Sequence, residues 1–117
     1  MTLNFEPAQT VNAYWMVTIV LDPSLGLSKR AVIEALDRAD IDSRPFFNPL
    51  SSLAAYAGAP AAERGRQLNA TTYRLSPYGV NLPSALRLTQ GDVVRVCDAV
   101  VEVLHGQPLA RASARIP

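Results

Sequence analysis

The sequence predicts an α/β domain of two layers (α+β), in which helices pack on a short antiparallel or mixed sheet. A run rich in β-branched and aromatic residues, 14–21, is typical of a strand. An amphipathic run, 28–39, carries its apolar residues at helical spacing, and a second extended run follows at 41–47. Strand, helix and strand within about 35 residues indicate a layered α/β unit.

Length and composition restrict the class of protein. A chain of 117 residues is the size of one domain and can bury roughly two thirds of its unfolded surface. Hydrophobic residues make up 49% and charged residues 18%, which excludes a chain that is disordered throughout. We expect a lead-in arm over 1–11, a folded domain over 12–106 and a flexible tail over 107–117.

Charge and cysteine usage exclude several partners. The 11 basic and 10 acidic residues nearly balance and form no basic stripe, so we expect no nucleic-acid partner. No apolar run approaches the ~20 residues that a membrane span requires, so we expect no membrane partner. The single cysteine, Cys97, cannot form an internal disulfide, and the sequence shows no signal peptide. We therefore expect a cytoplasmic protein.

The first half of the chain is predicted to hold a strand, a helix and a second strand. The strand over 14–21 is almost continuously apolar, so both of its faces should be at least partly covered. Ser28 can cap the helix that follows. The apolar face of this helix consists of Val32, Ile33, Leu36 and Ala39. Lys29, the only lysine, opens the helix on its polar side, where a solvated charge is expected.

The most specific segment is 41–53. Pro45 and Pro49 have no backbone N–H, so the segment predicts an edge strand that runs into a loop. Phe46 and Phe47 are neighbours on an extended chain and point to opposite faces. One of them should therefore enter the core while the other faces outward.

Four side chains of this segment predict the wall of a binding site: Arg44, Phe47, Asn48 and Ser51. Arg44 carries a planar fork that suits carboxylates and phosphates, and an aromatic ring, an amide and a hydroxyl follow it closely. The alternative is a rigid connection with one buried Phe and a surface Arg. Ser51 and Ser52 are also candidates to cap a following helix.

The second half is predicted to hold more helix than strand. We expect a short helix over 50–57, a mobile surface loop over 59–67, a helix over 70–75 and a strand over 78–84. Thr89 and Asp92 form a capping box that opens the last helix. The expected buried face of that helix consists of Val93, Val96, Cys97, Val100, Val101 and Leu104.

The residues alone do not predict catalysis. His105 lies at a helix end, where a cation complements the macrodipole, and no partner motif supports a catalytic role. Cys97 on an apolar helix face is typical of a buried core thiol. The glycines form no phosphate-binding loop, and His, Cys, Asp and Glu show no metal-ligand spacing. We expect no catalytic residue, no cofactor-binding residue and no metal ligand in this chain.

Four runs stand in a recognisable order: 12–16, 41–50, 79–84 and 88–89. Together they resemble the C-terminal small domain of the DegT/DnrJ/StrS family of PLP-dependent nucleotide-sugar aminotransferases, over about residues 11–104. The run Pro49-Leu-Ser-Ser-Leu53 is similar to the perosamine-synthase branch. Other members usually carry Pro-Leu-His here, so Ser51 replaces a histidine.

The resemblance implies a fold and an activity. Family members are fold-type I PLP enzymes and homodimers, and they transfer an amino group, usually from glutamate, to a keto sugar on a nucleotide. Their large N-terminal domain carries the Schiff-base lysine, the aspartate that pairs with the pyridine nitrogen and most phosphate contacts. The matching residues here belong to the small domain. The resemblance implies that Arg44, Phe47, Asn48 and Ser51 approach the active site from that domain.

Three functions follow as expectations. The first is a stand-alone or truncated C-terminal domain with a structural or assembly role, which binds no PLP alone and has no transaminase activity by itself. The second is a module that binds a nucleotide sugar or an anion with the former active-site wall. The third is an unrelated α/β interaction domain.

A small domain without its large partner exposes apolar side chains, so we expect a homodimer or a separate large-domain chain as partner. The candidates for exposure are Tyr14, Trp15, one of Phe46 and Phe47, Leu50 and Tyr56.

Overall fold

The sheet is the element on which the rest of the domain packs. A computed structural model describes residues 1, 6–106 and 116. Within these residues the strands are β1 (Val17–Val20), β2 (Arg44–Pro45) and β3 (Gly79–Leu82). They form one antiparallel sheet in the order β1-β3-β2, so the strand that comes last in the sequence lies at the centre. Thr18 and Arg44 both pair with Asn81, one from each side.

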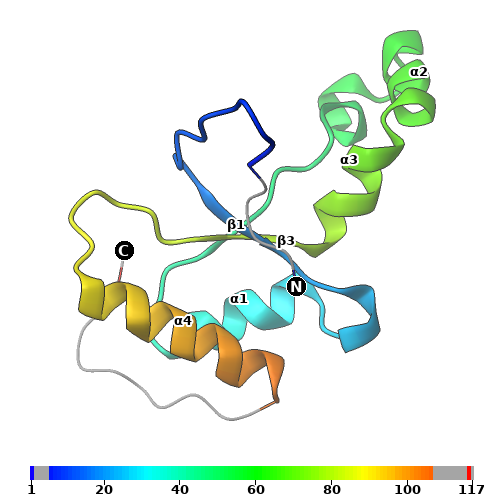
Figure 1. The fold of residues 1–117 in the computed structure, drawn as a ribbon. Coiled ribbons are helices and arrows are strands. Elements are labelled where there is room, and N and C mark those ends of the chain that lie inside the picture. Colours follow the sequence, from blue (N-terminus) through cyan, green and yellow to red (C-terminus); the bar gives the residue numbers. More distant parts are fainter. Residues whose placement is uncertain (2–5, 107–115, 117) are drawn as a thin grey trace.

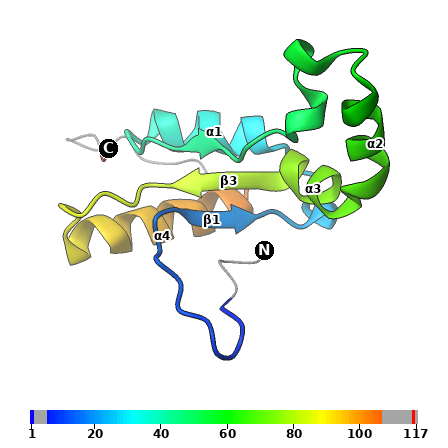
Figure 2. The same ribbon diagram turned by 90° about the horizontal axis from the view of Figure 1, so that it is seen from above.

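Two helices cover one face of this sheet. In the described part of the chain the helices are α1 (Lys29–Arg38), α2 (Pro60–Leu68), α3 (Ala70–Leu75) and α4 (Gln90–Leu104), and the 3-10 turns are η1 (Pro23–Leu25), η2 (Leu50–Ser52), η3 (Ala54–Tyr56) and η4 (Ser76–Tyr78). Figures 1 and 2 show α1 and α4 on one side of the sheet, with the N-terminal loop and α2–α3 rising on the other side. The predicted two-layer α/β class, with an antiparallel sheet, is confirmed.

The core lies between the sheet and these two helices. Ile19 and Val80 point inward from paired strands, and both are fully buried. The buried cluster consists of Ile19, Leu21, Val32, Leu36, Ala39, Ile41, Val80, Val96, Ala99, Val100, Val103 and Ile116. The predicted apolar face of α1 is confirmed, since Val32, Leu36 and Ala39 are all in this cluster.

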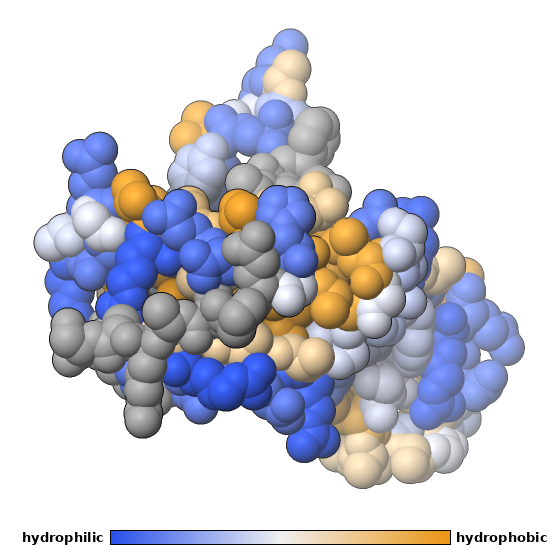
Figure 3. Space-filling model, turned by 90° about the horizontal axis from the view of Figure 1, so that it is seen from below, coloured by the Kyte–Doolittle hydropathy of each residue, from blue (hydrophilic) through white to orange (hydrophobic). Residues whose placement is uncertain are grey.

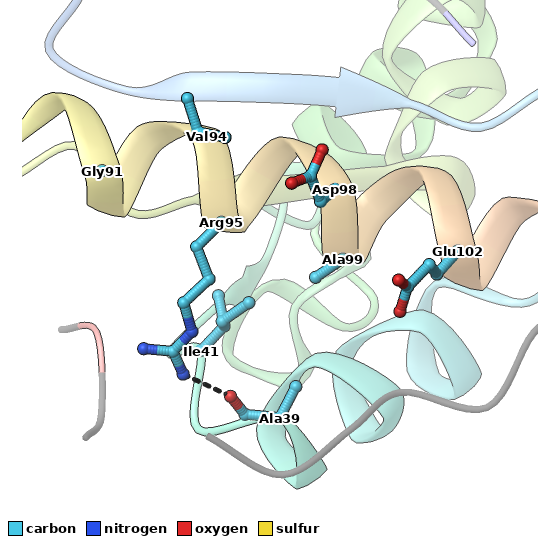
Figure 4. Close-up of a pocket in the computed structure, with 8 residues that line it drawn as sticks. All are labelled: Ala39, Ile41, Gly91, Val94, Arg95, Asp98, Ala99 and Glu102. Carbon is cyan, nitrogen blue, oxygen red and sulfur yellow. Dashed lines mark hydrogen bonds between the residues drawn. The ribbon is translucent and has the colours of Figure 1, made fainter. Parts of the chain in front are cut away.

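Arg95 joins the two helices of this layer. Its guanidinium extends from α4 and donates a hydrogen bond of 2.6 Å to the Ala39 carbonyl, at the C-terminal end of α1 (Figure 4). A cation at a helix C-terminus complements the helix macrodipole. A cavity of about 290 Å³ adjoins this contact, between Ala39, Ile41 and the Asp98 side of α4.

Residues 48–75 project from the domain, and we call this segment, which is distinct from the expected lead-in over 1–11, the arm. It contains η2, η3, α2 and α3 and stands away from the sheet in Figure 1. Its buried side chains are Pro49 and Ala62, so the arm has almost no core of its own. The conformation of the arm is therefore stabilised mainly by contacts at its base and by any partner that binds its surface.

Two predictions for the arm are wrong. The expected loop over 59–67 is the helix α2, which has Pro60 in its first turn and an ion pair of 2.9 Å between Glu63 and Arg66. Both features favour a helix, although Pro60 and Gly65 had indicated a loop. The expected single helix over 50–57 is instead two 3-10 turns, separated by Leu53 in an extended conformation.

The buried face of α4 is rotated relative to the prediction. The buried residues of this helix are Val96, Ala99, Val100 and Val103. Val93 and Val101 are each 48% exposed, and Cys97 is exposed rather than a core thiol. Figure 3 looks onto the helix layer from below and shows hydrophobic surface among charged side chains. Because α4 carries valines on two sides, the sequence makes two of its faces equally apolar, and this is why the predicted buried face is wrong.

Residues 6–16 form a loop before β1, which is closed by hydrogen bonds to Glu6. The Glu6 carboxylate accepts hydrogen bonds from the Tyr14 hydroxyl at 2.7 Å and from the Asn12 amide at 3.2 Å. The hydrogen bond to this carboxylate raises the pKa of the Tyr14 hydroxyl. Tyr14 has a left-handed φ of 48°, which ends extended structure there, so β1 begins at Val17 and not at 14.

Of the expected tail, 107–115 and 117 lie outside the described residues. Ile116 is 2% exposed and pairs with Ile41 in a parallel bridge. Its amide donates to the Asp40 carbonyl at 2.7 Å, and its carbonyl accepts from the Asp42 amide at 2.8 Å. At this one position the expected tail is part of the core. None of the helices in the described ranges is long and apolar enough to cross a membrane.

Candidate functional site

The candidate segment leaves the sheet at its edge. β2 is an edge strand as predicted, but its pairing covers Arg44 and Pro45 instead of the full 41–47. The Phe46 amide still donates to the Gly79 carbonyl at 3.0 Å. Beyond Phe46 the chain leaves β3 and enters the arm.

The prediction for the two phenylalanines holds in part: Phe47 faces outward, but Phe46 does not enter the core cluster, and the two rings contact each other. Phe46 is half-buried and lies over Gly79, whereas Phe47 is 56% exposed. Their ring centroids are 5.8 Å apart, with planes tilted by 51°. The Phe47 carbonyl accepts a hydrogen bond of 2.8 Å from the Ser76 hydroxyl. Phe47 therefore presents an outward ring on a backbone that is held in place.

Arg44 lies on the wall of a cavity that has both polar and apolar lining residues. Its guanidinium pairs with the Asp42 carboxylate at 2.9 Å, and the Arg44 side chain is 75% exposed. The cavity has a volume of about 250 Å³. Its lining consists of Met16, Asp42, Ser43, Arg44, Asn81, Leu82, Pro83, Ser84 and Ala85. A guanidinium that already holds one carboxylate has the geometry to hold another in its place.

A polar row crosses the sheet beside this cavity. Thr18, Asn81 and Arg44 are register partners on β1, β3 and β2. Since Ile19 and Val80 point into the core, the row lies on the face without helices. The Thr18 hydroxyl donates to the Asn81 side-chain oxygen at 2.8 Å. Sequence reasoning missed Asn81, although an asparagine inside a strand pattern is a signal of a polar contact.

Ser43 is a second residue that sequence reasoning missed. It is 7% exposed, and its hydroxyl has no hydrogen-bond partner among the residues that the structure describes. A buried hydroxyl without a partner is costly. Such a group next to Arg44 and Asn81 offers a polar contact to a small ligand.

Asn48 and Ser51 lie in the arm and do not line the cavity beside Arg44. The Ser51 hydroxyl shares a hydrogen bond of 2.9 Å with the Tyr73 hydroxyl, across the arm. Ser52 donates to the Pro49 carbonyl at 2.7 Å, so neither serine caps a helix as predicted. Asn48 is exposed. The four predicted site residues are thus divided: Arg44 lies at the cavity, Phe47 directly precedes the arm, and Asn48 and Ser51 lie in the arm.

Lys29 is not the solvated charge that was predicted. It is half-buried, and its Nζ donates to the Ser76 carbonyl at 2.9 Å and to the Phe46 carbonyl at 3.5 Å. The two carbonyls come from the two ends of the arm. His105 is exposed at the end of α4, and no metal-binding group of His, Cys, Asp and Glu occurs in the described ranges.

Comparison with known proteins places these features in a family. The sequence profile of the DegT/DnrJ/EryC1/StrS aminotransferase family matches residues 1–101. The chain belongs to this family. The predicted resemblance is confirmed, and with it a relationship to sugar aminotransferases.

Two curated relatives are GDP-perosamine synthases. The protein from Vibrio cholerae is 29% identical over 100 residues, which are 86% of this chain and 26% of the relative. The protein from Caulobacter vibrioides is 31% identical over 93 residues, which are 80% of this chain and 24% of the relative. The chain therefore spans about a quarter of the length of these relatives.

The described residues do not fit PLP, the coenzyme of DegT-family aminotransferases. PLP is held as an imine, which requires an unprotonated lysine amine free to attack its aldehyde. The only lysine, Lys29, donates instead to two backbone carbonyls at the base of the arm. These hydrogen bonds give Lys29 a structural role.

Proposed function

We propose that these residues act as the small-domain part of a PLP-dependent nucleotide-sugar aminotransferase and have no transaminase activity by themselves. The family match and the quarter-length overlap with GDP-perosamine synthases support this function. The engagement of Lys29 supports the absence of coenzyme chemistry in this part. In this proposal the catalytic part, which holds PLP, is supplied by further residues of the same polypeptide or by a separate chain.

The observation that carries this proposal is the exposed apolar surface. Trp15 is 73% exposed, Leu50 72%, Tyr14 57%, Phe47 56% and Tyr56 49%. These side chains are the ones expected to lose their cover when a small domain lacks its large partner. Exposed apolar surface of this kind normally has a binding partner. We propose that the arm and the exposed side chains of Tyr14 and Trp15 face the catalytic part.

Four residues are proposed to contact substrate in the assembled enzyme: Arg44, Phe47, Asn48 and Ser51. Arg44 offers its fork to a carboxylate or phosphate, and Phe47 offers an exposed ring for stacking. Asn48 is free at the surface, whereas Ser51 must give up its hydrogen bond to Tyr73 in order to reach a ligand.

Docking is tested with a fragment of the Caulobacter vibrioides GDP-perosamine synthase that lacks the quarter aligned with this chain. Sedimentation of the mixture measures association. Leu50→Asp should weaken it about tenfold or more, because a charge in an apolar contact is not solvated. Leu86→Asp is the matched control, since Leu86 is fully exposed and lies outside the arm, after β3. Equal binding of both variants, or no association of the unmodified chain, contradicts docking through the arm.

In the same proposal the isolated chain forms a homodimer, because a two-fold pairing is the commonest cover for an apolar surface. Sedimentation velocity at high micromolar concentration should show a dimer that Leu50→Asp dissociates. A clean monomer contradicts this part of the proposal.

A second candidate function is the binding of a small anionic or sugar ligand by the isolated chain. The cavity beside Arg44, with the unpartnered Ser43 hydroxyl and the Asn81 side chain, favours it. Calorimetric titration with a GDP-sugar and with PLP tests it, with Arg44→Ala as the variant. Binding that Arg44→Ala weakens about tenfold supports the second function. No heat with any ligand leaves only the docking function.

A further inference from the structure

The arm leaves the domain and returns to it at two neighbouring points. Phe47 precedes the arm and Ser76 follows it. The Ser76 hydroxyl donates to the Phe47 carbonyl at 2.8 Å, and Ser76 is 4% exposed. A partly buried hydrogen bond between residues 29 apart in sequence therefore closes the base of the arm.

Lys29 binds the same two chain segments from α1. Its Nζ donates to the Ser76 carbonyl at 2.9 Å and to the Phe46 carbonyl at 3.5 Å. Hydrogen bonds from a charged donor are stronger than neutral ones, so one ammonium group ties α1 to both ends of the arm. We call Lys29, Ser76 and the carbonyls of Phe46 and Phe47 the arm clasp.

The place of Lys29 on its helix supports a specific task. It is the first residue of α1, where a cation opposes the helix macrodipole. Its neighbour Arg30 points into solvent and pairs with Glu34 at 2.7 Å. The two basic neighbours thus differ: Arg30 makes a local ion pair, and Lys29 holds carbonyls that are 17 and 47 residues away.

We propose that Lys29 positions the arm, which is the surface proposed to face the catalytic part. This inference rests on the proposed function. Lys29 acts through the Phe46 and Ser76 carbonyls, which fix the direction in which the arm leaves the sheet. Phe47, directly before the arm, and Leu50, near its start, have exposed apolar side chains, so this direction determines where they point.

The clasp is tested first on the chain alone, without coenzyme, ligand or partner. Lys29→Met removes the donors and keeps the length of the side chain, Lys29→Arg restores a charged donor, and Arg30→Met is the matched control. The chain has three phenylalanines, Phe5, Phe46 and Phe47, so labelled Phe rings give few NMR signals. The contact between the Phe46 and Phe47 rings at 5.8 Å gives these signals distinct ring-current shifts.

In Lys29→Met the NMR shifts of the Phe46 and Phe47 rings should move toward a common averaged value. Hydrogen exchange of the Phe46 amide should become about tenfold faster or more, while the core methyl signals stay unchanged. Lys29→Arg should restore both readouts, and Arg30→Met should change neither. If Lys29→Met unfolds the chain, Lys29→Gln, whose shorter amide is an uncharged donor, provides the milder test and should loosen the same signals. Unchanged ring shifts and exchange in Lys29→Met, or in Lys29→Gln when it is the variant used, overturn the proposal.

A second measurement separates this inference from the proposed function. Lys29→Met should weaken association with the Caulobacter vibrioides fragment about tenfold, and Lys29→Arg should recover it. Full association of Lys29→Met with loosened Phe rings overturns the positioning role. Failure of the unmodified chain to associate counts against the proposed function, and the ring shifts still decide whether the clasp exists.

Discussion

Phe46 lies directly against the α-carbon of Gly79. A Cβ added to Gly79 would be 2.4 Å from the Phe46 Cβ and 2.8 Å from its Cγ. The Phe46 amide donates to the Gly79 carbonyl at 3.0 Å. Gly79 has an ordinary extended φ of −83°, so the glycine is required here for space and not for backbone conformation. The missing side chain lets the candidate segment lie close against β3.

Gly79→Ala should therefore displace Phe46. We expect a loss of about 1–3 kcal/mol in the free energy of unfolding, measured by urea denaturation, because overpacking forces backbone shifts. Gly91→Ala is the control, since a Cβ there meets only the Thr89 hydroxyl oxygen at 3.7 Å. That change should stabilise α4 by up to about 1 kcal/mol. Equal effects of the two substitutions would show that Phe46 does not pack on Gly79.

The hydrogen bond between Ser51 and Tyr73 should hold the arm together. Ser51→Ala and Tyr73→Phe each remove one of the two hydroxyls, which are 2.9 Å apart. In a double-mutant cycle on unfolding free energy we expect a coupling of about 0.5–1.5 kcal/mol. Additive effects would indicate that the hydroxyls act independently and that Ser51 is free for a ligand.

The capping box of α4 should make stability depend on pH. The Thr89 amide donates to the Asp92 carboxylate at 2.9 Å, and this hydrogen bond lowers the pKa of Asp92 below its ordinary 3.8. The stabilisation is complete above that ordinary value and is lost as pH falls through the lower pKa of the folded state. Asp92→Asn should lower the Tm at neutral pH, and the difference should shrink as pH falls below 3.8. A Tm difference between Asp92→Asn and the unmodified chain that does not change with pH would contradict this role of the capping box.

The thiol of Cys97 should react in the native state. Cys97 is exposed on α4, so a disulfide reagent such as Ellman's reagent should titrate one thiol per chain without denaturant. A thiol that becomes reactive only after denaturation would restore the expectation of a core cysteine. Protection that appears only at high protein concentration would instead place Cys97 in a dimer interface.

Local signals in the sequence predicted the elements that depend on local chemistry. The caps at Ser28 and Thr89 open helices where expected. Pro45 predicted the edge position of β2, and the exposure of one of the two neighbouring phenylalanines, Phe47, was also predictable from one extended segment.

Contacts between distant residues could not be predicted in this way. The bonds from Lys29 to Phe46 and Ser76 depend on how α1 meets β2 and η4, which no local pattern shows. The pairing of Arg44 with Asn81 likewise depends on β3 entering the centre of the sheet. In α4, valines occur on two sides of the helix, so the sequence did not determine which side is buried.

The central claim is that this chain supplies a small-domain surface and no coenzyme chemistry. Incubation with PLP, reduction with borohydride and peptide mass mapping test it most directly. Because the Lys29 Nζ is held by two carbonyls, Lys29 should take up no more pyridoxyl label than the N-terminal amine. A visible imine band whose reduction places the pyridoxyl group mainly on Lys29 would contradict the claim.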